Sequence, residues 1–150
     1  MFYSSLLALH VLTVVIWVGG MFFAYNFLRP AAAEMLEPPH RLKLWVATFK
    51  RFFPWVWLSV VVILITGLGM MFSLPKAPAH ILIMAALGIS MMLIFGHVYF
   101  GPYKRLKNAV SNENWPEGAK HLGKIRTLVG INTIIGLVTI VIATAGRSWF

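Results

Sequence analysis

The sequence contains four long apolar runs without any Asp, Glu, Lys or Arg, and this feature limits the possible folds more than any other. The runs cover about residues 2–28, 54–74, 79–100 and 128–145. Each is close to the ~20 residues that an α-helix needs to cross the hydrocarbon core of a bilayer. None alternates apolar and polar side chains, as the strands of a membrane β-barrel do. We therefore predict an all-α fold, a four-helix transmembrane bundle.

Composition supports this prediction. The 150 residues are 59% hydrophobic and only 11% charged, whereas about a quarter of a soluble domain is charged. A chain of this length forms one domain, so we expect a single integral membrane domain over residues 1–150 that contacts the lipid bilayer. The net charge of +9 does not indicate a nucleic-acid partner, because the basic residues lie in loops and at helix ends, where they bind lipid headgroups. The absence of cysteine excludes disulfides and thiolate sites.

The distribution of Lys and Arg predicts the orientation of the bundle. Residues 29–53 contain five of them and residues 101–127 contain six, but the second connection has only Lys76 and the C-terminal tail only Arg147. Loops rich in Lys and Arg stay in the cytoplasm. We therefore expect both the N- and the C-terminus outside.

Two segments outside the apolar runs also have helical patterns. Leu42, Trp45, Phe49 and Phe53 recur at helical spacing between basic residues, which predicts an amphipathic helix on the cytoplasmic leaflet. Asn114 precedes a Trp-Pro-Glu sequence that is typical of a helix start with proline in the first turn. We expect the helix that begins there to continue into the fourth run.

The histidines are the main candidates for chemistry, because an imidazole inside a span is costly unless it is paired or ligated. His10 lies about two turns inside the first run and shares one helical stripe with Trp17. The alternative is a structural imidazole that is hydrogen-bonded to a neighbouring helix. His40 and His121 belong to basic loops, and we expect both to be solvated.

His80 opens the third run, Met84 follows one turn deeper, and His97 lies near the inner end of the same run. Helical rise puts Met84 at about the depth of His10 and His97 ~15–20 Å further in. We therefore predict His10, His80 and Met84 as metal ligands, with His10 paired with His80 or Met84 if a haem has two protein ligands.

Trp17 and His97 complete the predicted cofactor-binding residues. An inner set of His97 with Met21 or Asn132 is an alternative, as is a hydrogen bond between His97 and Asn132. The methionines at 70–71, 84 and 91–92 could bind Cu(I), which prefers thioether and imidazole ligands. Methionine is also an ordinary lipid-facing and gap-filling residue, and this is the interpretation we prefer for them.

Short motifs in all four runs resemble the copper-resistance D (CopD) family of bacterial membrane proteins. These are His10 followed by Trp17 and Gly19-Gly20, the Thr66-Gly67 pair, the segment FGHVYFGPYKRL, and the segment IRTLVGINTIIGL. A more distant resemblance is to HemJ-type protoporphyrinogen oxidases, which also have a histidine and a tryptophan in their first span. Their His-x-Lys and Asn-Glu patterns are missing here, because Leu82 occupies the position of the lysine and Thr133 that of the glutamate.

The resemblances imply two kinds of cofactor, haem b and copper. Haem needs one or two axial side chains and an apolar slot, whereas a copper channel needs polar groups or methionines at every depth. With the bacterial family, we expect a multi-pass b-type haem protein of the bacterial inner (cytoplasmic) membrane, for electron transfer or haem handling. The alternatives are copper uptake through His and Met of the spans, HemJ-like protoporphyrinogen oxidation, and a structural subunit of a redox complex. The protein could also be a membrane oxidoreductase, and the sequence does not indicate its catalytic residues. A membrane redox partner, a quinone and homo-oligomerisation are possible as well.

Overall fold

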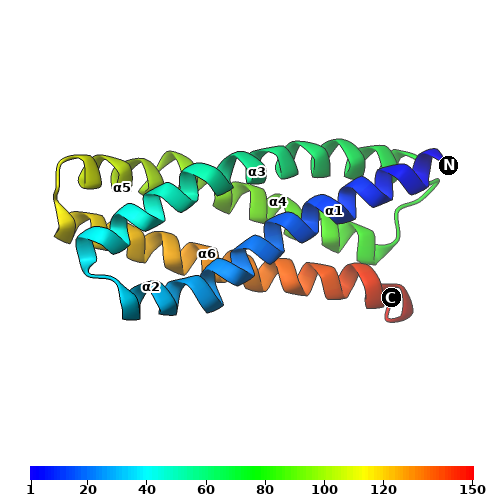
Figure 1. Ribbon diagram of the computed structural model, residues 1–150. Coiled ribbons are helices and arrows are strands. Elements are labelled where there is room, and N and C mark those ends of the chain that lie inside the picture. The colour runs from blue at the N-terminus through cyan, green and yellow to red at the C-terminus, as the bar shows by residue number, and fades with distance from the viewer.

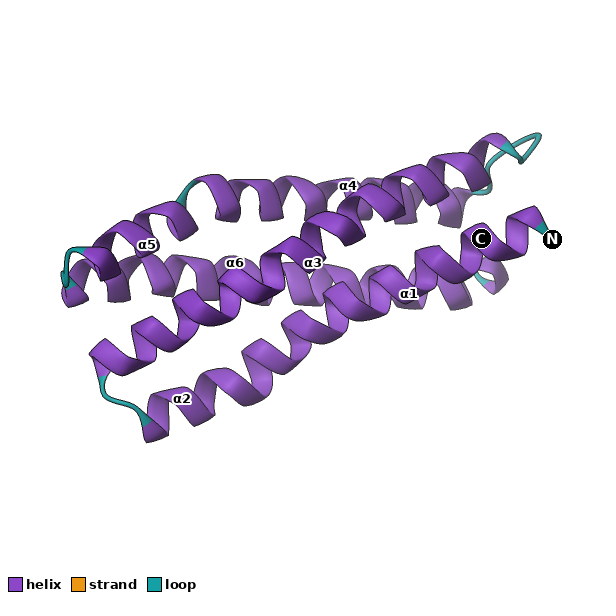
Figure 2. Cartoon of the chain, turned by 45° about the horizontal axis from the view of Figure 1, so that its top comes forward, coloured by secondary structure: helices purple, strands orange, loops and turns teal.

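The computed structural model covers residues 1–150 and consists of helices joined by short turns (Figures 1 and 2). Their order is α1 (Phe2–Phe23), the π-helical turn η1 (Ala24–Leu28), α2 (Arg29–Met35), α3 (Pro38–Phe72), α4 (Ala79–Phe100), α5 (Pro102–Ser111), α6 (Trp115–Ala145) and the 3-10 turn η2 (Gly146–Ser148). Four helical stretches are long and apolar enough to cross a membrane. The predicted all-α four-helix bundle is confirmed, and the side of the membrane on which the termini lie stays a prediction.

The two ends of the bundle differ in the connections and in the number of basic residues that they carry. Both chain termini and the α3–α4 connection lie at one end, which we call the terminal end (Figure 1). The α2–α3 and α5–α6 turns lie at the other, which we call the basic end (Figures 1 and 2). Eleven of the thirteen Lys and Arg belong to the two segments that form the basic end, residues 29–53 and 101–127.

The amphipathic segment at 40–53 does not form a separate surface helix. It is the first part of α3, which runs without a break through Pro54. Its apolar side chains Leu42, Trp45, Phe49 and Phe53 are buried in the protein core rather than in lipid. Leu42 lies beside Gly118 of α6, and the Phe49 ring meets Tyr103 of α5 edge-on at 5.9 Å. The prediction of a helix was right, but its placement on the leaflet was wrong.

Helix α5 provides the surface that covers this face of α3. Its apolar residues Tyr103, Leu106 and Ala109 are buried, and the helix packs along α6. The predicted start of α6 is confirmed, because the Asn114 side chain accepts a hydrogen bond from the Glu117 backbone N–H at 3.4 Å. Capping of this kind satisfies a donor that the first helical turn leaves unpaired.

One residue assigned to the solvated loops is in fact inside the protein. His121 is 6% exposed, and its Nε2 lies 3.1 Å from a carboxylate oxygen of Glu117. The two residues are four apart on α6, which places them on the same face. The expectation of a solvated His121 was therefore wrong, whereas His40 is exposed as expected.

The protein core lies mainly in the half of the bundle nearer the basic end. Stacked and edge-on aromatic contacts join Phe49, Phe53, Phe95 and Tyr103. In α4 the buried residues are Met91, Phe95 and Val98, all in the second half of the helix. The half nearer the termini is packed less densely, and the candidate site lies there.

Candidate functional site

A cavity of about 270 Å³ lies between the helices in the half of the bundle nearer the termini. Residues of α1, α3, α4 and α6 line it, and none of them is Asp, Glu, Lys or Arg. The hydrogen-bonding side chains in its wall are His10, Trp17, Thr139 and Thr144. It is therefore an apolar chamber with one imidazole, which is the composition typical of small-molecule and cofactor sites.

A hydrogen bond to α3 fixes the His10 imidazole. The Thr66 hydroxyl lies 2.6 Å from the Val62 carbonyl oxygen and 2.9 Å from the His10 Nδ1. When the hydroxyl donates its one proton to Val62, it accepts from Nδ1–H, and Nε2 then has the lone pair that binds a metal. When it donates to Nδ1 instead, Nε2 carries the ring proton.

Gly67 lies against the His10 ring. A Cβ atom at this position would be 3.4 Å from His10 Cε1, which is an ordinary van der Waals contact. The neighbouring Thr66 and Gly67 thus both contact the imidazole, and Thr66 does so through a hydrogen bond. The prediction included the Thr-Gly pair only as a motif, because a contact between residues 56 positions apart depends on how α1 and α3 pack.

Soft ligands surround the same cavity. Met84 lines it as its depth predicted, and Met71, Met91 and Met92 also contribute to the wall. Trp17 lines the inner end, and its ring packs edge-on against Phe95 at 6.2 Å. Three of the predicted residues, His10, Trp17 and Met84, therefore share one cavity.

The other two predicted residues lie elsewhere. His80 is half-buried at the start of α4 beside the Gly146 turn, one residue before the lining residue Ile81. Its Nδ1 is buried without a hydrogen-bond partner. His97 is exposed near the other end of α4, close to Gly101.

The alternative inner set is not brought together. Met21 and Asn132 are buried, whereas His97 faces outward. The Asn132 amide instead donates to the Met91 carbonyl at 3.3 Å, which ties α6 to α4. The chain has no group of three His, Asp or Glu side chains that could hold a metal ion.

Together, the four apolar helices and the half-buried His10 imidazole define a multi-pass membrane protein with a cavity between its helices. The model of the family described as copper resistance protein D matches residues 46–145, which is two thirds of the chain. The chain belongs to this CopD family. No curated protein and no solved structure gives a significant match.

Proposed function

We propose that this protein is a membrane b-type haem protein, for electron transfer or haem handling, with His10 as the iron ligand. The observation that carries the proposal is the half-buried His10 imidazole, hydrogen-bonded at Nδ1 to Thr66, in the wall of a cavity without charged residues. A haem supplies four nitrogen ligands itself and needs only one or two from the protein. One imidazole with nearby thioethers therefore suits haem better than it suits a metal ion held by protein ligands alone.

The donor set and the wall of the cavity fit a haem, but the volume of the cavity requires some side chains to move when a haem binds. The volume of about 270 Å³ is just below the ~300–1,000 Å³ of known ligand sites. A flat macrocycle would need side chains to move aside, and four of those in the wall are methionines, which repack readily. Met84 on the facing helix is the best second ligand within the cavity, and His80 at its edge is the alternative.

The residues of the cavity would have distinct roles. Haem supplies one-electron redox chemistry when bound. Thr66, by accepting a hydrogen bond from His10 Nδ1, would hold the ring proton there and keep Nε2 available. The aliphatic and methionine side chains exclude water and lower the local dielectric, which tunes the potential of a metal site.

Optical spectra of the purified protein test this proposal. Protein from haem-replete cells should show a Soret band and a reduced α-band, and both should be lost in His10→Ala. His40→Ala removes an exposed imidazole outside the cavity and serves as the matched control, with an unchanged spectrum. His97→Ala should also keep the spectrum. A colourless, metal-free wild-type preparation would overturn the proposal.

Copper binding is the second candidate, and the methionines favour it. His10, Met71, Met84, Met91 and Met92 line one cavity, and Cu(I) prefers imidazole and thioether ligands. A neighbouring cavity deeper in the bundle has one thioether, Met21, and only Thr48, Asn132 and the Trp17 indole as polar side chains. It has no imidazole, so the soft ligands are concentrated in the His10 cavity, which favours a copper site over a copper channel. Protein that retains Cu(I) without a Soret band, and loses it in both His10→Ala and Met84→Leu, would support this candidate over haem.

A further inference from the structure

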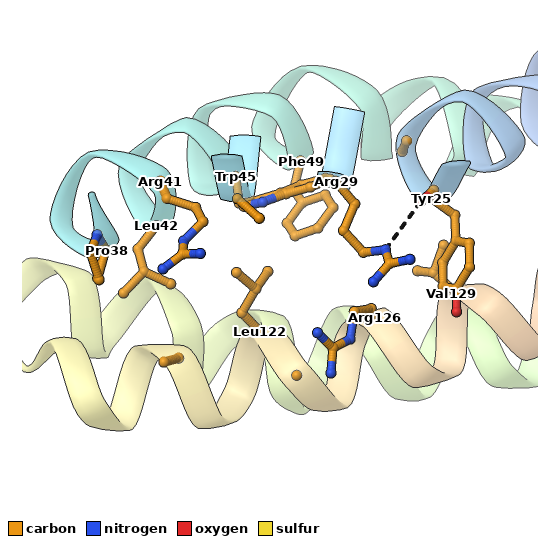
Figure 3. A pocket seen from close by; sticks show the side chains of 14 residues that line it. Tyr25, Arg29, Pro38, Arg41, Leu42, Trp45, Phe49, Leu122, Arg126 and Val129 are labelled. Carbon is orange, nitrogen blue, oxygen red and sulfur yellow. Dashed lines mark hydrogen bonds between the residues drawn. The ribbon is translucent and has the colours of Figure 1, made fainter. Parts of the chain in front are cut away.

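A second cavity, of about 260 Å³, lies at the basic end of the bundle, far from His10. Three arginines line it: Arg29 at the start of α2, Arg41 in α3 and Arg126 in α6. Figure 3 shows Arg29 and Arg41 extending from one wall and Arg126 lying along the opposite helix. No Asp or Glu lines the cavity. We call it the arginine cavity.

The three guanidinium groups have no anionic partner in the chain. The only ion pairs are those of Glu117, with Lys120 and His121. Arg29 is instead held by Tyr25, whose carbonyl accepts from Nε at 3.1 Å (Figure 3) and whose ring lies 4.5 Å below the guanidinium. Arg29 and Arg41 are half-buried, whereas Arg126 is exposed. Like charges around a partly dehydrated space repel one another, and a bound anion would relieve this repulsion, most for the two half-buried guanidinium groups.

The remaining wall of the arginine cavity is apolar, and it leads toward a third cavity. Trp45, Phe49 and Leu122 form part of this wall. The third cavity, of about 190 Å³, is almost entirely apolar and shares Ala24, Phe49 and Val129 with the arginine cavity. A space for an anion is therefore adjacent to a space for hydrocarbon.

We propose that the arginine cavity binds an anionic phospholipid, with its phosphate among Arg29, Arg41 and Arg126 and an acyl chain toward the third cavity. Guanidinium groups pair with phosphate oxygens through two parallel hydrogen bonds. Basic pockets between transmembrane helices are known places for anionic headgroups. The site is independent of the cofactor at His10. Phosphate is the shared chemistry, and a free phosphate is the other source of the same anion.

Native mass spectrometry of the full chain in detergent tests this site. The probes are dioleoyl phosphatidylglycerol, dioleoyl phosphatidylcholine, glycerol phosphate and inorganic phosphate. Phosphatidylglycerol should bind about tenfold or more tightly than phosphatidylcholine, because only its net negative headgroup is free to pair with the arginines. Neither soluble phosphate should compete at equal concentration. Equal binding of the two lipids would overturn the proposal, and glycerol phosphate that binds as tightly as phosphatidylglycerol would replace lipid by a soluble ligand.

A charge-matched pair of variants separates this site from general surface charge. The double variant Arg41→Gln with Arg126→Gln should lose the tenfold preference. The control, Lys50→Gln with Lys124→Gln, removes one exposed charge from α3 and one from α6, and neither lysine lines the cavity. The control should keep the preference. An equal loss in both double variants would overturn the proposal.

A cavity-filling variant tests the site without a change of charge. Gly123 lines the arginine cavity, and a Cβ there would meet no atom within 4 Å. Gly123→Leu therefore adds volume toward open space in a helix that tolerates leucine well. It should displace bound phosphatidylglycerol. This variant also tests the placement of the lipid in the arginine cavity if the arginine variant fails to fold. Unchanged binding in folded Gly123→Leu would overturn the placement of the lipid in this cavity.

Discussion

The His10 cavity and the arginine cavity are similar in volume, about 270 and 260 Å³, but their walls have opposite chemistry. The first has one imidazole among aliphatic side chains and methionines, and the second has three guanidinium groups beside aromatic rings. The first suits an uncharged or internally compensated group, whereas the second suits an anion. Similar space at the two ends of one bundle therefore selects different ligands through the polar atoms in each wall.

The packing around the two cavities differs as well. Near the basic end, α5 covers α3 and α6, and rings such as Phe53 and Tyr103 pack at 4.8 Å. Near the termini no additional helix covers the bundle, and α4 has no buried residue before Met91. Regions with few buried contacts open at lower free energy than a packed core. The half with His10 is thus the one that can admit a bulky cofactor, while the aromatic half holds the bundle together.

The largest expected effect concerns the side of the membrane that each cavity faces. Alkaline phosphatase folds only outside the cytoplasm, so a fusion after Phe150 should be active and one near Asn112 silent. The physical reason is the excess of Lys and Arg in the loops of the basic end. Enzyme assays on cells expressing each fusion measure this difference. The reverse pattern would place the arginine cavity at the outer leaflet and contradict the predicted orientation.

Two glycine variants should disturb one cavity each. In Gly130→Ala the new Cβ would lie 2.8 Å from the Tyr25 ring, and in Gly136→Ala it would lie 2.9 Å from Val18. Overpacking of this kind costs about 1–3 kcal/mol, so both should lower the unfolding temperature in detergent. Because Tyr25 holds Arg29, Gly130→Ala should weaken phosphatidylglycerol binding and leave the Soret band unchanged. Gly136→Ala should weaken the Soret band and leave phosphatidylglycerol binding unchanged.

Gly88→Ala is the control for this pair. Gly88 lines the His10 cavity, but a Cβ there would meet no atom within 4 Å. Alanine is favoured over glycine inside a helix by up to about 1 kcal/mol, so this variant should be as stable as the wild type or more so. If Gly130→Ala and Gly136→Ala change both binding signals equally, the two cavities are not independent.

The sequence predicted the parts of this fold that depend on local patterns. Four uncharged runs indicate four spans, and Asn114 with the following proline indicates the start of α6. Depth along a helix follows from rise per residue, which is why Met84 lies on the same cavity as His10. These inferences need no knowledge of which helices are neighbours.

What the sequence could not predict depends on that knowledge. An amphipathic segment shows that one face is buried but not whether lipid or protein buries it, so α3 at Trp45 was assigned to the leaflet. Helix α5 was not predicted, because Pro102–Ser111 is rich in basic residues and was treated as loop. The arginines of the second cavity come from three distant segments, and only packing brings Arg29 near Arg126.

The smallest expected effect comes from the bond that holds His10. Thr66→Val keeps the shape of the side chain but removes the hydroxyl that accepts from Nδ1, so the ring can rotate and either nitrogen can carry the proton. Loss of a partner to a metal-binding histidine typically weakens binding by about tenfold. Haem titration of the purified protein should show this decrease, with a broadened or shifted Soret band. Thr66→Ser retains the hydroxyl and should bind as the wild type does. Phosphatidylglycerol binding at the other end should be the same in both variants. If Thr66→Val binds haem as tightly as Thr66→Ser, the Thr66 hydroxyl does not control the imidazole, and the argument for a free Nε2 fails with it.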